Sequence, residues 1–107
     1  MSCSVFRGDK LYYWCPACKS MTSVPAKRWN WNGSLDKPTL APSVRETCGP
    51  FPDGKILCCH YFLVEGVMQY CGDCTHAFRN MNVPIPDLDT VITIVPKEEE
   101  GLQYHLK

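Results

Sequence analysis

Short runs rich in β-branched, aromatic and aliphatic residues recur along the chain, and such runs predict strands. They lie at residues 11–14, 20–24, 56–64, 67–71 and 90–95. Residues 74–80 are expected to form one short helix, because Asp73 precedes them as a candidate N-cap. The pattern therefore predicts a small α+β domain that is rich in β-structure, with a C-terminal strand at 90–95.

A β-hairpin is expected over residues 56–72, because only a Glu-Gly pair separates two β-prone runs. The expected cross-strand pairs are Val64 with Val67, Leu63 with Met68, Tyr61 with Tyr70 and His60 with Cys71. In this register Cys59 and Cys74 share one face, and His60 lies on the other. A slip of one residue would reverse the two faces, so the register alone does not choose between metal ligands.

Cysteine and histidine clusters indicate a metal site. Cys15 and Cys18 flank a Pro-Ala turn within residues 11–25, which is the layout of a zinc knuckle. The later clusters can complete a tetrahedral zinc shell, and Asp73 could orient a ligating histidine. Four of the following six residues are expected to bind Zn²⁺: Cys15, Cys18, Cys59, His60, Cys74 and His76. The domain is therefore interpreted as zinc-stapled.

Length and composition limit the class of protein. A chain of 107 residues is expected to form a single domain over 1–107, and eight cysteines suggest that it needs a staple. No apolar run precedes the first charges, so a reducing cytoplasm is expected and metal is favoured over disulfides. No stretch reaches the roughly 20 apolar residues that span a bilayer. Eleven basic and eleven acidic residues argue against nucleic acid as a partner.

Residues 29–43 form a long irregular stretch with an Asn-Gly turn and two prolines. Trp29, Trp31 and Asn32 could together form an aromatic surface that stacks a base or docks a partner. The alternative is that the tryptophans fill a small core beside the metal. The aromatic loop at 29–43 is therefore a candidate binding surface that the sequence leaves open.

Four motifs occur in a specific order, namely W-x-W-N-G at 29–33, K-P-T-L-x-P-S at 37–43, C-H-x-F at 59–62 and G-D-C-T-H-A-F at 72–78. This order resembles a family of small, poorly characterised phage and bacterial proteins that are often labelled "ammonia monooxygenase". The resemblance implies that the site is built from Cys15, Cys18, the Cys59-His60 pair, Cys74 and His76. Where that family has glycine this chain has Asn80, which tolerates a left-handed turn.

The favoured function is a zinc-binding adaptor, encoded by a phage and acting on a host component in the host cytoplasm. Its partner is expected to be a host or phage protein, with a small molecule as the other option, and the oligomeric state stays open. Whether the chain is an enzyme is also left open, with a binding role preferred. One alternative is a metal-dependent hydrolase that uses His60, Asp73 or His76 in acid–base chemistry. Another is a nucleotide-binding protein that uses the aromatic loop.

Overall fold

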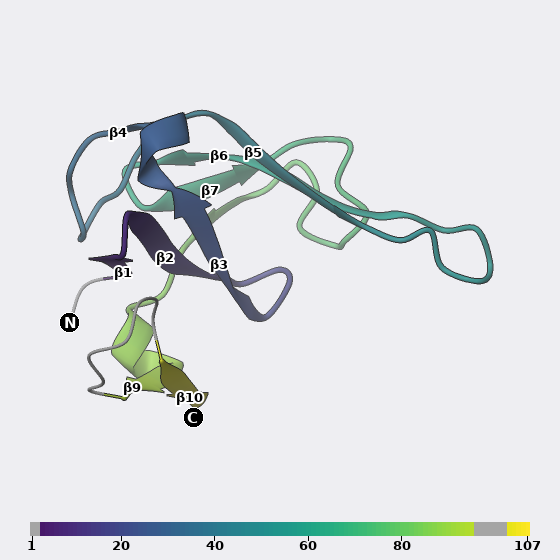
Figure 1. The fold of residues 1–107 in the computed structure, drawn as a ribbon. Coiled ribbons are helices and arrows are strands. Elements are labelled where there is room, and N and C mark those ends of the chain that lie inside the picture. The colour runs from purple at the N-terminus through teal and green to yellow at the C-terminus, as the bar shows by residue number, and fades with distance from the viewer. Residues whose placement is uncertain (1–2, 96–102) are drawn as a thin grey trace.

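The computed structural model describes residues 3–95 and 103–107, and their strands form three antiparallel sheets (Figure 1). Two 3₁₀ helices, η1 (Ala26–Arg28) and η2 (Leu88–Thr90), are the helical elements of this described part. The expectation of a small fold rich in β-structure is therefore confirmed, and the fold contains almost no helix. Among the described residues, no helix is both long enough and apolar enough to cross a membrane.

The first sheet has the order β1-β2-β3, with β1 at Ser4–Arg7, β2 at Lys10–Cys15 and β3 at Ser20–Pro25. Its strands alternate in burial, and β2 turns Leu11, Tyr13 and Cys15 into the core. The knuckle at 16–19 is the turn that joins β2 to β3. The metal-binding motif is thus attached to a regular antiparallel hairpin.

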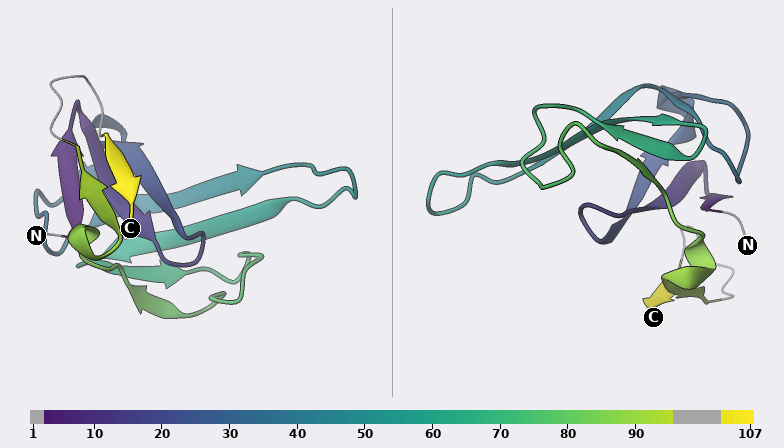
Figure 2. Two further views of the ribbon diagram at one scale, coloured as in Figure 1. Left: turned by 90° about the horizontal axis from the view of Figure 1, so that it is seen from below. Right: turned by 180° about the vertical axis from the view of Figure 1, so that it is seen from behind.

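The second sheet has the order β4-β5-β6-β7-β8. The strands are β4 (Asn30–Trp31), β5 (Leu40–Cys48), β6 (Leu57–Val64), β7 (Val67–Tyr70) and β8 (Asn82–Pro84). The predicted hairpin register is confirmed from Val64 opposite Val67 to Tyr61 opposite Tyr70. β5 and β6 extend past their neighbours as a two-stranded arm (Figures 1 and 2).

The main core lies between the first and second sheets. Tyr13 from β2 and Tyr61 from β6 are fully buried, and their hydroxyl groups share a hydrogen bond. Leu63 and Met68 complete the core from the hairpin of β6 and β7. Burying these side chains is the main stabilising term available to a chain of this length.

The C-terminal part adds a third, two-stranded sheet of β9 (Ile92–Ile94) and β10 (Tyr104–Leu106). Leu88 and Ile92 form a second apolar cluster there, which packs against Tyr12 and Trp14 from the opposite side of the first sheet. The first sheet therefore has apolar contacts on both faces, whereas the second sheet leaves one face open to solvent.

The predicted helix over 74–80 is wrong, because these residues form turns. Thr75 gives its backbone N–H to Cys58 of β6, and its hydroxyl accepts from the Cys58 N–H, so the segment is tied sideways to a strand. Asn80 does adopt the left-handed conformation, with φ of 63°. The expected aromatic loop is also shorter than 29–43, since β4 and the start of β5 lie within it.

Candidate active site and thiol cluster

A bulge in β5 sets the direction of Ser43. From Leu40 to Val44 the strand advances four residues, while its partner strand moves only two, from Leu63 to Tyr61. Bulges of this kind re-aim side chains. Val44 and Tyr61 are buried on the inner face of the second sheet, the face that meets the first sheet. Because side chains alternate along a strand, Ser43 projects from the opposite, outer face.

His60 lies on the same outer face, one strand away, and contacts Ser43. The Ser43 hydroxyl lies 2.9 Å from His60 Nε2. The other ring nitrogen, Nδ1, lies 3.0 Å and 3.1 Å from the two carboxylate oxygens of Asp73. A carboxylate at Nδ1 holds the ring proton there, which leaves Nε2 free to accept the proton of the hydroxyl.

Asp73 reaches His60 because the segment after β7 is fastened to β6. Cys71 donates its backbone N–H to the His60 carbonyl at 2.8 Å. The Cys74 thiol donates to the same carbonyl at 3.1 Å and accepts from the His60 N–H at 3.3 Å. These three bonds bracket Asp73 in the chain. The carboxylate is therefore held at its histidine by backbone contacts on both sides.

The outer-face group of Ser43, His60 and Asp73, called the triad below, is open to solvent. The side chains of His60 and Asp73 are 24% and 47% exposed. The guanidinium of Arg45 lies 3.9 Å from Asp73, which adds a weak, water-screened attraction. The Trp29 indole N–H donates to the Ser43 carbonyl at 3.5 Å, so the aromatic segment supports the backbone of the hydroxyl residue.

The inner face of β6 contributes Cys59 to a cluster of three thiols, whose other members come from the end of β2 and from the knuckle. The sulfur atoms of Cys15, Cys18 and Cys59 all lie within 4.8 Å of one another, which is close enough to share a metal ion. Cys15 and Cys59 are 3.8 Å apart and buried. The Cys18 backbone N–H donates to Cys15 Sγ at 3.4 Å, as expected for a knuckle. Three of the six predicted ligands therefore meet.

Electrostatics in this thiol cluster place one negative charge on Cys15. A hydrogen bond from Cys59, supported by one from Tyr70, lowers the pKa of Cys15 to about 5. Its partner responds in the opposite sense, because donating to Cys15 and being buried both raise the pKa of Cys59. Burial and the charge on Cys15 raise the pKa of Cys18 to about 11. Sulfurs that compete for protons in this way favour a divalent cation as the common partner.

Cys59 and His60 are consecutive residues of β6, and they point to opposite faces of the sheet. One strand thus links the thiol cluster to the triad. A further group, His60 with Cys71 and Asp73, also has its ligand atoms within 4.8 Å of one another and could hold a metal. In that group, however, both ring nitrogens of His60 already have partners in Asp73 and Ser43.

A family model of a bacterial ubiquitination-like system serine protease (BubE) matches residues 3–71. The chain belongs to the BubE family. The match includes Ser43 and His60, and it ends two positions before Asp73. Among curated proteins none matches the chain, and none of the solved structures does.

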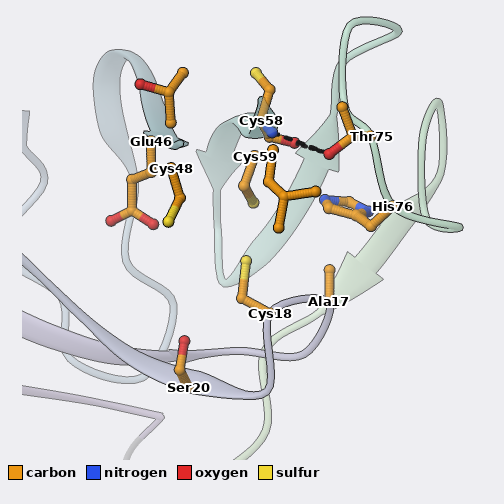
Figure 3. Close-up of a pocket in the computed structure, with 11 residues that line it drawn as sticks. Ala17, Cys18, Ser20, Glu46, Cys48, Cys58, Cys59, Thr75 and His76 are labelled. Carbon is orange, nitrogen blue, oxygen red and sulfur yellow. Dashed lines mark hydrogen bonds between the residues drawn. The ribbon is translucent and has the colours of Figure 1, made fainter. Parts of the chain in front are cut away.

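In this BubE family member, the other predicted ligands include Cys74 and His76. Cys74 lies outside the thiol cluster, with its sulfur bonded to the backbone of His60. His76 lines a cavity of about 570 Å³ together with Cys18 and Cys59 (Figure 3). The cavity includes none of the triad residues. His60, predicted as a candidate ligand, is contacted by Asp73, which was predicted to orient a histidine.

Two residues of the predicted aromatic surface have local structural partners. The Trp31 indole donates to the Ser34 carbonyl at 3.0 Å, and its ring stacks on Phe6 with centroids 5.2 Å apart. The side-chain oxygen of Asn32 accepts from the backbone of Ser34 and Thr39, both at 3.1 Å. These contacts organise the turn between β4 and β5.

Ser43 is a candidate site residue that the sequence does not reveal. In the sequence it is the last position of a proline-containing segment, and serine is too common to stand out alone. Its partner His60 lies 17 positions further on, and Asp73 lies 13 beyond that. Only indirect evidence for Ser43 exists in the sequence. If His60 and Asp73 are taken as a histidine–carboxylate pair, a hydroxyl on the neighbouring strand would complete a nucleophile, base and orienting group.

Proposed function

We propose that this chain is a serine protease that acts on a ubiquitin-like protein or its conjugate. The observation that carries the proposal is the continuous hydrogen-bonded line from Ser43 through His60 to Asp73, at 2.9 Å and 3.0 Å. These distances lie within the range required of a nucleophile, its base and the group that orients the base. The description of the BubE family supplies the ubiquitination-like system.

Each residue then has a defined role in acyl transfer. His60 Nε2 takes the proton of Ser43 as the Ser43 oxygen bonds to the substrate carbonyl carbon. The imidazolium gives that proton to the leaving amine, and the carbon–nitrogen bond breaks. Water then gives a proton to His60 and its hydroxyl to the acyl carbon. His60 returns that proton to the Ser43 oxygen as the bond between Ser43 and the acyl carbon breaks. Asp73 stabilises the imidazolium throughout and fixes the ring orientation.

The exposure of the triad supports a macromolecular substrate. Ser43 is half-buried on an open sheet face, and Phe62, two residues from His60 on the same face, is 45% exposed. A small molecule is usually enclosed by a concave pocket, whereas an open face can receive an extended chain. Phe62 offers that chain an apolar contact beside the reacting groups.

We also propose zinc as the metal of the thiol cluster. Zinc–sulfur bonds of about 2.3 Å at the tetrahedral angle place two sulfurs about 3.8 Å apart. The sulfurs of Cys15 and Cys59 are separated by 3.8 Å. Three thiolates favour a soft or borderline cation over magnesium or calcium. Zinc bound there would join the knuckle to β6 and supply folding energy.

Several expectations from the sequence stay predictions. They are the adaptor function, the phage origin, the host partner, the cytoplasmic location and the likeness to the family labelled "ammonia monooxygenase". The hydrolase alternative shares His60 and Asp73 with the present proposal, but it requires a metal in place of the Ser43 hydroxyl. Replacing Ser43 distinguishes the two mechanisms, because a metal-bound water would not need that residue.

The test is cleavage of a ubiquitin-like protein from a bacterial ubiquitination-like system. It is offered both with a C-terminal peptide extension and as a conjugate to a lysine side chain, and the products are followed by intact mass. The proposal expects one defined cleavage by the native chain and none by Ser43→Ala. Cleavage that persists in Ser43→Ala, or failure to cleave either form, would contradict it.

A further inference from the structure

The side chain of His76 is hydrogen-bonded, among the described residues, at one of its two ring nitrogens. Nδ1 accepts from the Phe78 backbone N–H at 3.2 Å. Nε2 is buried and has no hydrogen-bond partner among the described residues. A buried imidazole nitrogen without a hydrogen-bond partner destabilises the folded state. Such an atom therefore indicates that a further group binds there.

The position of His76 indicates which partner that is. His76 lines the same cavity as Cys18 and Cys59, and Figure 3 shows the three side chains around it. The ligand atoms that lie within 4.8 Å of one another are the three sulfurs without His76 Nε2, so the ring has to move toward the thiols when a metal binds. Three thiols leave one corner of a tetrahedral shell to fill, and imidazole nitrogen is a preferred zinc ligand.

We propose that His76 Nε2 completes the zinc shell formed by Cys15, Cys18 and Cys59, and that the metal thereby positions Asp73. The other candidate, Cys74, is engaged elsewhere, since its thiol both donates to and accepts from the His60 backbone. A shell of three cysteines and one histidine is an ordinary closed structural zinc site.

Metal binding through Nε2 has a local consequence. The ring proton must then sit on Nδ1, which turns that nitrogen from an acceptor into a donor. The Phe78 N–H, now 3.2 Å away, has to turn from the ring, and the Nδ1 proton needs a carbonyl or water as its acceptor. A small movement of the turn at 76–79 therefore accompanies loading.

The link to Asp73 follows from the chain. Asp73 and His76 lie in one short turn segment, and Cys59 and His60 are consecutive in β6. A metal bound by both Cys59 and His76 would join β6 to the turn segment. This link would lie within a few residues of the contact between Asp73 and His60, and would hold the two segments together there. In this scheme the zinc takes no part in the reaction, and His76 acts as a positioning residue. This second part rests on the proposed protease function, whereas the metal site does not.

The experiment is a cobalt(II) titration of the native chain and of four variants, because tetrahedral Co²⁺ gives an intense visible absorption that reports its ligands. His76→Ala is expected to weaken Co²⁺ binding at least about tenfold. His76→Cys should restore tight binding, with the spectrum of a four-sulfur site. Cys74→Ser, whose hydroxyl can keep both bonds to the His60 backbone, should bind as the native chain does. The same is expected of His105→Ala, which replaces an exposed histidine in β10.

Hydrolysis of p-nitrophenyl acetate by the zinc-loaded proteins gives the second readout. The proposal expects kcat to fall in His76→Ala and to recover in His76→Cys, a rescue that a merely space-filling role of the ring would not give. Native affinity for Co²⁺ in His76→Ala, or lost affinity in Cys74→Ser, would overturn the ligand assignment. An unchanged kcat in His76→Ala would overturn the positioning role. If even the native chain fails to hydrolyse the ester while the cobalt results hold, the protease function fails and the metal site stands.

Discussion

The two faces of the second sheet differ in how their polar groups are satisfied. On the outer face, the triad residues are partly exposed. His60 contacts Ser43 through one ring nitrogen and Asp73 through the other. On the inner face, Cys59 meets Cys15 of the first sheet, and both thiols are buried. A solvated, fully bonded group is suited to exchange protons with a substrate, whereas buried sulfurs are suited to hold a cation permanently. We therefore expect the outer face to carry the proposed chemistry and the inner face to contribute stability.

The largest effect should come from the nucleophile. Ser43→Ala is expected to lower kcat for ester hydrolysis by about a thousandfold or more, because the attacking oxygen is lost. His60→Asn should cost a similar factor, and the double variant should be no worse than either single one, since the residues act as a unit. Stopped-flow or absorbance kinetics measure these rates. Effects that simply multiplied in the double variant would contradict a triad.

The orienting carboxylate gives the next effect. Asp73→Asn keeps the shape of the side chain but offers a donor to Nδ1, which favours the wrong ring tautomer. We expect kcat to fall by about 10³- to 10⁴-fold while the melting temperature changes little. The matched control is Asp53→Asn in the turn at the tip of the arm, where the side chain contacts the nearby Lys55. Equal losses in both variants would rule out a special role for Asp73.

Changes on the inner face should act on stability instead. Cys15→Ser, or removal of metal with a strong chelator, is expected to lower the melting temperature by about 10 °C or more, because the knuckle is no longer joined to β6. Cys48→Ser replaces an exposed cysteine outside the thiol cluster, and it should leave the melting temperature unchanged. Calorimetry with and without added zinc gives the answer. A chelator that has no effect on melting would argue against a structural metal.

Two neighbouring residues of β6 sharpen the contrast between the faces. Leu63 is fully buried, so Leu63→Ala should destabilise the fold by about 2–5 kcal/mol. Phe62 is 45% exposed, so Phe62→Ala should cost less than about 1 kcal/mol but reduce kcat/KM for a protein substrate. Denaturant unfolding and kinetics separate the two effects. The contrast fails if Phe62→Ala proves the more destabilising change.

The smallest effect is expected at the backbone support of Ser43. Trp29→Phe keeps an aromatic ring but removes the indole N–H that donates to the Ser43 carbonyl at 3.5 Å. Such a bond contributes about 1 kcal/mol, so kcat should fall only a few-fold. Trp31→Phe removes an N–H that bonds to Ser34 instead, and should leave kcat unaltered. Equal effects from both tryptophans would mean that the bond to Ser43 does not matter.

The hairpin of β6 and β7 could be predicted because its determinants are local. Alternating apolar residues fix the buried face, and the Glu65-Gly66 loop fixes the register, with φ of 47° and 78° at the two positions. The same local reasoning failed at 74–80. There, hydrogen bonds to β6 outweigh a cap and a helical pattern, and such long-range contacts leave no mark in a short window of sequence.

The site could be predicted in part for a similar reason. Cys15 and Cys18 can be predicted as a pair from their spacing within one turn. Their contact with Cys59 forms when the two sheets pack together. The triad has no such spacing, because Ser43 depends on a bulge in β5 and Asp73 on a turn fastened to β6. Residues of these types from three separate segments become a site only after the tertiary fold places them side by side.

The most direct test of the account is the reaction of the folded chain with a fluorophosphonate, followed by intact and peptide mass spectrometry. Such a reagent forms a covalent bond with an activated serine hydroxyl and spares ordinary ones. The account predicts one adduct per chain, located at Ser43, that is absent in Ser43→Ala and slow to form in Asp73→Asn. No adduct on the native folded chain, or an adduct that persists in Ser43→Ala, would contradict the assignment of Ser43 as the nucleophile.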